Sequence, residues 1–144
     1  MKLSTKGRYG TRALLDIALH DREEPVPLKD IAQRQQISLP YLEHLITPLI
    51  EGGIIRSTRG VGGGVSLVKS PEQIRLSEVI GLLEGSLAPV KCVANPAICG
   101  RSAFCVTRDI WSELKTAMDG VLELTTLQDL IERQRRKGQP MYYI

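Results

Sequence analysis

The chain has 144 residues, of which 42% are hydrophobic and 24% charged, with 13 Gly and 8 Pro. This composition is ordinary for a globular protein and excludes the collagen-like and disordered classes. Glycine, proline or a charge interrupts every apolar run well before the roughly 20 residues that a membrane span needs. The start MKLSTKGRYG also lacks an apolar leader, so we expect a cytoplasmic protein with no membrane partner.

The net charge of +3 is unevenly distributed along the chain. Residues 1–70 carry ten basic and seven acidic side chains, whereas residues 71–144 carry nine of each. A polyanion is therefore expected to bind the first half of the chain.

The first half begins with three predicted helices. Apolar residues at helical spacing predict a helix from about residue 5 to 20, and a second helix after Pro27. After a turn at 36–37, Ser38 is expected to cap a third helix, which the glycines at 52–53 stop.

Pro48 conflicts with this third helix. A proline in a helix interior removes one backbone hydrogen bond and costs on the order of 3 kcal/mol. We therefore expect the third helix to kink or end at Pro48.

A predicted β-hairpin follows the helices. The β-prone segments 54–57 and 65–68 flank the glycine-rich loop 58–64, and a short helix from Ser77 to Glu84 comes next. Helix, turn, helix and hairpin is the order of a winged helix-turn-helix. We therefore predict a mainly α fold with a small β-hairpin wing, and a winged helix-turn-helix domain over residues 1–85.

The remainder of the chain divides into a cysteine-bearing loop, 86–103, and a helical segment, 104–144. A long helix is expected from Ser102, with a broad apolar stripe suited to dimerisation that contains Ile110, Leu114, Ala117, Val121 and Leu124. Thr126 and Asp129 have the spacing of a capping box that opens a last helix.

The residues expected to contact DNA lie on the polar side of the third helix and at the hairpin tip. Side chains with donors and acceptors would read base edges and phosphates, and a protruding arginine suits a narrow minor groove. The candidates are Ser38, Pro40, Tyr41, Glu43, His44, Arg59 and Gly60. Alternatively, residues 28–68 are a small packing unit with a flexible turn. A phosphate-cradling nucleotide loop is disfavoured because no helix directly follows the glycines.

The three cysteines, Cys92, Cys99 and Cys105, have the spacing C-x6-C-x5-C. This spacing argues against structural zinc, which favours closer cysteine pairs. Three thiols from a loop and a helix start suit a soft metal or an iron–sulfur cluster that lacks a fourth protein ligand. With Ser102 as the helix cap, the helix dipole would stabilise a Cys105 thiolate, which favours cluster binding and thiol redox chemistry equally.

Four features together resemble one family: the start KLSTKGRYGTRALLDIAL, the run PVPLKDIAQRQQISLPYLEHLI, the loop RSTRGVGGGVSL and the three late cysteines. They are similar to the winged-helix regulators typified by the iron–sulfur cluster regulator IscR and the nitric-oxide sensor NsrR. The resemblance implies a homodimer with a long crossing helix, a palindromic double-stranded DNA operator and a repressor. It also implies that Cys92, Cys99 and Cys105 hold a cluster, with [2Fe–2S] favoured over [4Fe–4S].

Several positions depart from the family pattern. Ser38, Tyr41, Glu43 and Arg59 match its DNA-contacting positions, whereas Pro40 and His44 differ at neighbouring ones. Arg108 and Arg8 stand where related proteins carry the fourth cluster ligand, and Asp109 and Glu113 are the nearest acidic replacements.

Three functions follow from this pattern. A non-enzymatic, cluster-sensing DNA-binding regulator accounts for the charge distribution, the wing, the cysteines and the long helix. A winged-helix regulator that senses redox or sulfur status through thiols or a partner protein, without a cluster, is the alternative. An iron–sulfur electron carrier or enzyme accounts for the cysteines alone, because no nucleophile and base set is present.

Overall fold

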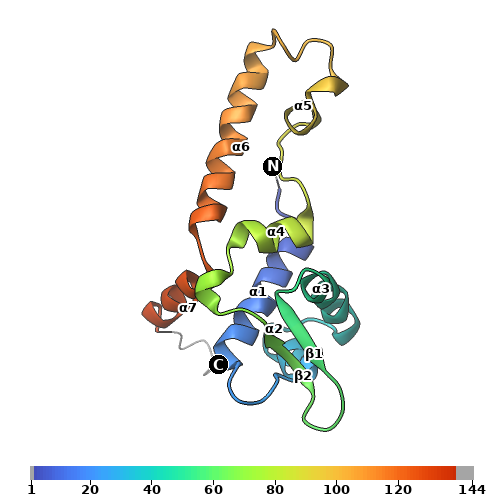
Figure 1. Cartoon of the computed structure of the whole chain (residues 1–144), viewed down its shortest axis with the longest axis vertical. Helices are drawn as coiled ribbons and strands as arrows, with labels where there is room; N and C mark the ends of the chain where they lie inside the picture. The colour runs from blue at the N-terminus through green and yellow to red at the C-terminus, as the bar shows by residue number, and fades with distance from the viewer. Residues whose placement is uncertain (1, 139–144) are drawn as a thin grey trace.

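The structure is a computed structural model that describes residues 2–138. Its elements in chain order are α1 (Thr5–His20), α2 (Leu28–Gln35), α3 (Leu39–Glu51), β1 (Ile55–Thr58), β2 (Gly64–Leu67), η1 (Pro71–Gln73), α4 (Leu76–Glu84), α5 (Lys91–Ala94), η2 (Pro96–Ile98), α6 (Val106–Leu124) and α7 (Leu127–Arg136). Figure 1 shows a rounded base from which α5 and α6 project. We call residues 2–85 and 125–138 the base, and residues 86–124 the arm.

Helix α1 runs through the base and contacts α2, α3, α4, α7 and β2. The apolar positions of α1 and α3 face one another in a common core, in which Leu14, Ile17, Leu42 and Leu49 are each 0% exposed. Helices α1 and α4 approach closely because Gly10 has no side chain. A Cβ atom at Gly10 would lie 2.5 Å from a methyl carbon of Leu83.

The hairpin is a two-stranded antiparallel sheet in which Ile55 pairs with Leu67 and Thr58 with Gly64. A two-stranded hairpin alone is marginally stable. This hairpin is supported by Val26, in the loop after α1, whose N–H and C=O exchange hydrogen bonds of 2.8 and 2.9 Å with Val65 of β2. Val65 and Val26 are both buried, so the hairpin is attached to the core.

Helix α7 follows α6 where the arm meets the base, and it completes the base (Figure 1). The expected capping box is confirmed, because the side chains of Thr126 and Asp129 each accept a hydrogen bond from the other's backbone N–H. Leu127 and Ile131 are buried against the base, and the N–H of Leu127 donates to the carbonyl of Ile74 at 2.8 Å. Residues 139–144, the end of the predicted segment 104–144, lie outside the described residues.

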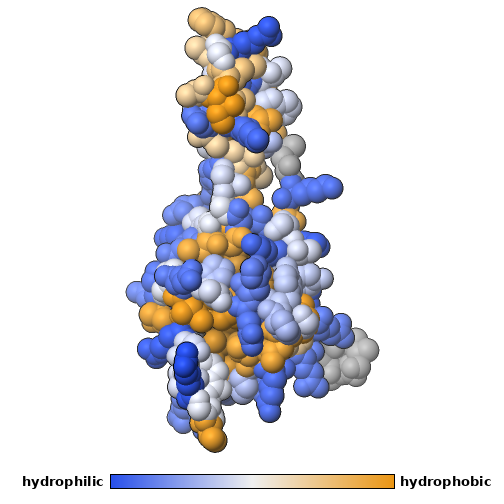
Figure 2. All heavy atoms as spheres, turned by 90° about the vertical axis from the view of Figure 1, so that its right-hand side faces the viewer, coloured by the Kyte–Doolittle hydropathy of each residue, from blue (hydrophilic) through white to orange (hydrophobic). Residues whose placement is uncertain are grey.

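The arm contrasts with the base in having an apolar surface that no other part of residues 2–138 covers. No residue of α6 is buried, and its exposed apolar side chains include Val106, Ile110, Val121 and Leu124. Figure 2 shows hydrophobic side chains gathered on this projecting part of the molecule.

The mainly α fold with a hairpin wing is confirmed, and three local predictions need correction. Helix α3 continues through Pro48 to Glu51, so it does not end at the proline. Helix α6 begins at Val106 rather than Ser102, because residues 101–104 form turns. The predicted cysteine-bearing loop, 86–103, also contains two short helical segments, α5 and η2.

Candidate DNA-binding face and cysteine segment

The first turn of α3 presents an exposed polar surface. Ser38 caps the helix, because its hydroxyl oxygen accepts a hydrogen bond of 3.3 Å from the N–H of Tyr41. The side of α3 that carries Leu42, Leu45, Ile46 and Leu49 is buried in the core. The opposite side is therefore exposed, and it carries Ser38, Pro40, Glu43 and His44.

Tyr41 is half-buried and differs from these neighbours in its environment. Its ring packs edge-on against Tyr9 of α1, with 6.2 Å between ring centroids. The Tyr41 hydroxyl is buried and, among residues 2–138, has no hydrogen-bond partner. The guanidinium groups of Arg8 and Arg12 lie 5.9 and 5.0 Å from the Tyr9 ring centroid, within cation–π range. Positive charge from α1 therefore lies close to the start of α3, which the sequence pattern did not reveal.

The hairpin tip, residues 59–63, carries the remaining candidates. Arg59 and Gly60 are exposed, and Gly60 has a φ of 96°, a conformation that glycine adopts readily. The N–H of Gly63 closes the turn by donating to the carbonyl of Gly60 at 2.9 Å. The hairpin and α3 lie on the same side of the base (Figure 1), and Figure 2 views the molecule from that side.

The three cysteines lie at three successive helical elements of the arm, α5, η2 and α6. Cys92 lies in α5, Cys99 follows η2, and Cys105 is the residue that precedes the first turn of α6. All three are free thiols, with Cys99 exposed and the other two half-buried. Ser102 does not cap α6, because its hydroxyl donates to the carbonyl of Pro96 at 2.8 Å. Cys105 takes the N-cap position instead.

Hydrogen bonds around Cys105 stabilise its thiolate form. A hydrogen bond with the Thr107 hydroxyl, 3.2 Å from its sulfur, lowers the pKa of the Cys105 thiol, and the backbone N–H of Arg108 adds to the effect. The Arg108 side chain also donates from Nε to the carbonyl of Cys92 at 3.1 Å. Arg108 and Cys99 line a shallow hollow of about 430 Å³. Arg108 therefore lies next to all three cysteines: it bonds the carbonyl of Cys92, bonds Cys105 through its backbone N–H, and lines the same hollow as Cys99.

The donor chemistry of these cysteines suits an iron–sulfur cluster, since clusters are held by thiolates. Within residues 2–138, however, no group of three or more His, Cys, Asp or Glu side chains lies close enough together to hold a metal ion. The cysteine segment would therefore have to close around a cluster. Arg108 is not an ordinary metal ligand, and Asp109 and Glu113 are exposed on α6.

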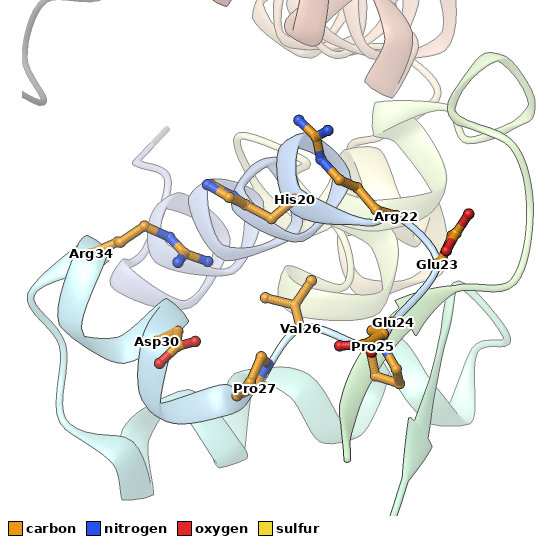
Figure 3. Close-up of a pocket in the computed structure, with 9 residues that line it drawn as sticks. All are labelled: His20, Arg22, Glu23, Glu24, Pro25, Val26, Pro27, Asp30 and Arg34. Atoms are coloured by element: carbon orange, nitrogen blue, oxygen red, sulfur yellow. The ribbon is translucent and has the colours of Figure 1, made fainter. Parts of the chain in front are cut away.

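A larger hollow of about 820 Å³ lies away from the cysteines, beside the loop between α1 and α2 (Figure 3). Its lining mixes basic His20, Arg22 and Arg34 with acidic Glu23, Glu24 and Asp30. Because the two signs of charge largely offset each other, the hollow does not select a ligand of one charge.

Comparison with known proteins places this architecture in a family. The profile of the Rrf2 family, described as iron-dependent transcriptional regulators, matches residues 3–133. The chain belongs to the Rrf2 family. It is 50% identical over 131 residues to the protein rrf2 of Nitratidesulfovibrio vulgaris, covering 91% of this chain and 87% of that protein. It is 40% identical over 134 residues to the transcriptional regulator IscR of Photorhabdus laumondii, covering 93% of this chain and 81% of that protein.

Solved structures agree with this assignment. The structure of IscR from T. potens superposes with a TM-score of 0.79 at 38% identity, covering 100% of this chain and 97% of that one. CymR, the global cysteine regulator of B. subtilis, superposes with a TM-score of 0.77 at 37% identity, covering 92% and 98%. The predicted IscR-type family is confirmed. This Rrf2-family protein is a transcriptional regulator of the same type as these relatives. Among the described residues, no helix is both long and apolar enough to cross a membrane.

Proposed function

We propose that this Rrf2-family protein is a cytoplasmic homodimer that regulates transcription by binding a palindromic operator in double-stranded DNA. The observation that carries the proposal is the exposed polar turn of α3 on the same side as the exposed Arg59 and Gly60 (Figure 1). In a winged helix-turn-helix the second helix enters the major groove. Ser38, Pro40, Tyr41, Glu43 and His44 would then read or flank the bases, and Arg59 and Gly60 would contact the minor groove or the backbone.

The arm supports the homodimer. Val121 is 66% exposed and Leu124 is 79% exposed on a helix that has no buried residue. An apolar stripe of this kind is costly in water and favours association with a matching helix. A second copy of α6 would cover it and set the distance between two α3 helices, which is what a palindrome reads.

The cysteine segment supports cluster sensing. Cys92, Cys99 and Cys105 would supply three thiolates to a [2Fe–2S] cluster, in preference to [4Fe–4S]. The hydrogen bonds to Cys105 lower the pKa of its thiol, which eases the loss of its proton. A bound cluster would supply iron that is reactive toward oxidants or nitric oxide. The cysteine segment begins after Glu84, the last residue of α4, and ends at α6. If it closed around a cluster, it would change how the DNA-binding base is connected to the dimer helix.

A second candidate is direct thiol sensing without a cluster. It is favoured by two observations: the lowered pKa of Cys105, and the absence of a preformed metal site among residues 2–138. Partially exposed cysteines of low pKa are the ones that oxidise reversibly. In this case a peroxide would oxidise Cys105 to a sulfenic acid. The thiol of Cys92 or Cys99 would then attack that sulfur, forming a disulfide and releasing water.

Anaerobic reconstitution with iron and sulfide, read by absorption and Mössbauer spectroscopy, tests the two candidates together. An operator would first be selected from a randomised duplex library with the wild-type protein. Each cysteine would be changed to alanine, with Ser86→Ala in the same segment as the matched control. Cluster sensing predicts that wild type and the control take up the cluster, that each Cys→Ala variant loses it, and that operator affinity changes on loading.

Two results would contradict parts of this proposal. Wild type that takes up no cluster, but loses operator affinity reversibly on oxidation through Cys105, would establish thiol sensing instead. Wild type that enriches no duplex from the library would refute DNA-binding regulation itself.

A further inference from the structure

Asp16 is the only charged side chain that is buried among residues 2–138, at 3% exposed. It lies on α1 within the core-facing stripe, where Ala13, Leu14 and Ile17 are 0% exposed. A buried carboxylate costs several kcal/mol unless it is paired and hydrogen-bonded, so its partners show what the charge does there.

The side chains that donate hydrogen bonds to the Asp16 carboxylate come from the last turn of α2, while His20 of α1 lies 3.5 Å from its Oδ1. Arg34 donates to both Asp16 oxygens, from Nη2 to Oδ1 at 2.6 Å and from Nε to Oδ2 at 3.0 Å. Gln35 donates from Nε2 to Oδ2 at 2.9 Å. Figure 3 shows Arg34 reaching from α2 toward α1. Such a forked, charge-assisted contact fixes the relative orientation of two helices, which non-directional apolar packing does not.

A second contact secures the same end of α2. Arg12, one turn before Asp16 on α1, donates from Nε to the side-chain oxygen of Gln35 at 3.1 Å and from Nη2 to its backbone carbonyl at 3.2 Å. Two residues of α1, Arg12 and Asp16, therefore bind Gln35 from successive turns of the helix. We call Arg12, Asp16, Arg34 and Gln35 the α1–α2 clamp.

The clamp lies next to the turn, residues 36–38, that sets the direction of α3. Directly after Gln35, Gln36 has a φ of 56° and is the only non-glycine residue of positive φ in the described chain. A side chain in this left-handed conformation is strained and persists where the surroundings determine it. Only residues 36–38 separate the clamp from the start of α3, so the direction of α3 depends on how the end of α2 is held.

The clamp also reaches α3 through ring contacts. The Arg12 guanidinium lies over Tyr9, and the Tyr9 ring packs edge-on against Tyr41 in the first turn of α3. Arg12 therefore touches both the residue before the turn and the aromatic pair behind the DNA-facing surface of α3.

We infer that Asp16 is a positioning residue for DNA recognition. Through Arg34 and Gln35 it fixes the turn at residues 36–38. Through Gln35 and Arg12 it supports the Tyr9–Tyr41 pair, so that α3 is held at one angle to the base. This inference rests on the proposed DNA-binding function. The clamp contributes to discrimination between operators without making a base contact itself. A role limited to stabilising the fold would leave discrimination unchanged.

Gln35→Ala is the sharpest test, because it removes the side-chain link between Arg12 and Asp16. It leaves the Asp16–Arg34 ion pair and the Arg12 bond to the backbone carbonyl of residue 35 to hold the fold. Gln33→Ala, at an exposed position of the same helix, is the matched control. We expect Gln35→Ala to lower the ratio of operator to non-operator affinity on the order of 10-fold, as the misplacement of one base contact would. The salt dependence of non-operator binding should not change, since no phosphate contact is lost.

Hydrogen exchange of the DNA-free protein gives a second readout. Gln35→Ala and Asp16→Asn should both accelerate exchange in residues 36–42, while the core segment of α1 stays protected below the melting temperature. Variants that melt earlier but keep the wild-type affinity ratio and the wild-type exchange of 36–42 would overturn the inference and leave the proposed function intact. Wild-type protein that prefers no duplex would refute the proposed function, and the inference with it.

Discussion

The base and the arm obtain their structure in different ways. In the base, Leu14, Leu42 and Leu127 come from three distant parts of the sequence, and each is 0% exposed in a shared core. In the arm, α6 has 19 residues and buries none of them. Burial of apolar surface is the main favourable term in folding. The base therefore gains stability from its own packing, whereas α6 gains little in the protomer. This difference leads to five predictions, given from the largest expected effect to the smallest.

Leu42→Ala should destabilise the base severely. Loss of a fully buried leucine side chain costs about 2–5 kcal/mol through lost burial and the cavity left behind. Val106→Ala, at a 75% exposed position of the arm, should leave the unfolding of the base within about 0.5 kcal/mol of wild type. Urea unfolding followed by circular dichroism measures both; equal losses would show that the arm is part of the core.

Val121→Arg should separate the proposed dimer without unfolding the protomer. The substitution places a charge in the apolar stripe of α6, and we expect dimer affinity to fall on the order of 100-fold or more, about 2.7 kcal/mol. Thr116→Arg, also exposed on α6 and likewise adding one positive charge, is the charge-matched control. Sedimentation equilibrium gives the mass of each; a Val121→Arg variant that remains dimeric would place the interface elsewhere.

Arg59→Ala should weaken operator binding by about 1–3 kcal/mol. Arg59 is on the base, so the arm should be unaffected and the variant should remain a dimer. A change at Glu43 should instead alter the preference among operators more than the overall affinity. Titration of variant operators at one fixed salt concentration separates the two effects, and full affinity of Arg59→Ala would point to another DNA-binding surface.

Glu84→Gln tests the N-terminal cap of α1, in the base next to the point where the arm begins. The Glu84 carboxylate accepts hydrogen bonds from the hydroxyl and N–H of Ser4 and from the N–H of Gly7, and thus caps α1. These bonds, with that of the Ser4 hydroxyl first, lower the pKa of Glu84. A cap of this kind contributes about 1 kcal/mol, which Glu84→Gln should remove in large part.

The contribution of the same cap should depend on pH in a defined direction. Because the pKa of Glu84 is lowered on folding, its stabilisation is fully present above the ordinary value of 4.5 and is lost as the pH falls below it, through the pKa of the folded state. The stability difference between wild type and Glu84→Gln should therefore shrink in acid. A difference that is constant from neutral pH to pH about 3 would contradict the capping role.

A matched pair of glycine substitutions should give the smallest effects. Gly81 in α4 and Gly120 in α6 are both helical, and a Cβ atom at either would meet nothing within 4 Å. Gly81→Ala should stabilise the base by about 0.5–1 kcal/mol through helix propensity. Gly120→Ala, placed in the monomeric Val121→Arg background, should raise helical ellipticity without moving the melting temperature of the base. A shift of that temperature would show that the arm and base unfold together.

The sequence by itself determined the features that rest on short-range chemistry. The Ser38 cap, the glycine stop after α3, the hairpin loop and the capping box at Thr126 were each readable, because each depends on residues a few positions apart. The exposed polar side of α3 was readable for the same reason, since helical periodicity assigns its faces.

Only the tertiary structure decided which distant segments meet. Helix α6 begins at Val106 and not at the predicted Ser102, because the Ser102 hydroxyl donates a hydrogen bond to the carbonyl of Pro96. Local capping preferences do not predict this contact. Helix α3 continues through Pro48 because the packing of Leu45 and Leu49 on either side holds the helical path against the lost hydrogen bond.

The pairing of the buried Asp16 with Arg34 was likewise decided by the fold. An acidic residue inside the apolar stripe of α1 was a visible signal that a partner was required, yet many arginines in the chain had the right charge. The choice of Arg34 follows from the angle at which α2 packs on α1, and the same packing brings Val26 against β2 and α7 against α1. These contacts depend on complementary faces brought together by the whole core, and a local pattern holds no information about that arrangement.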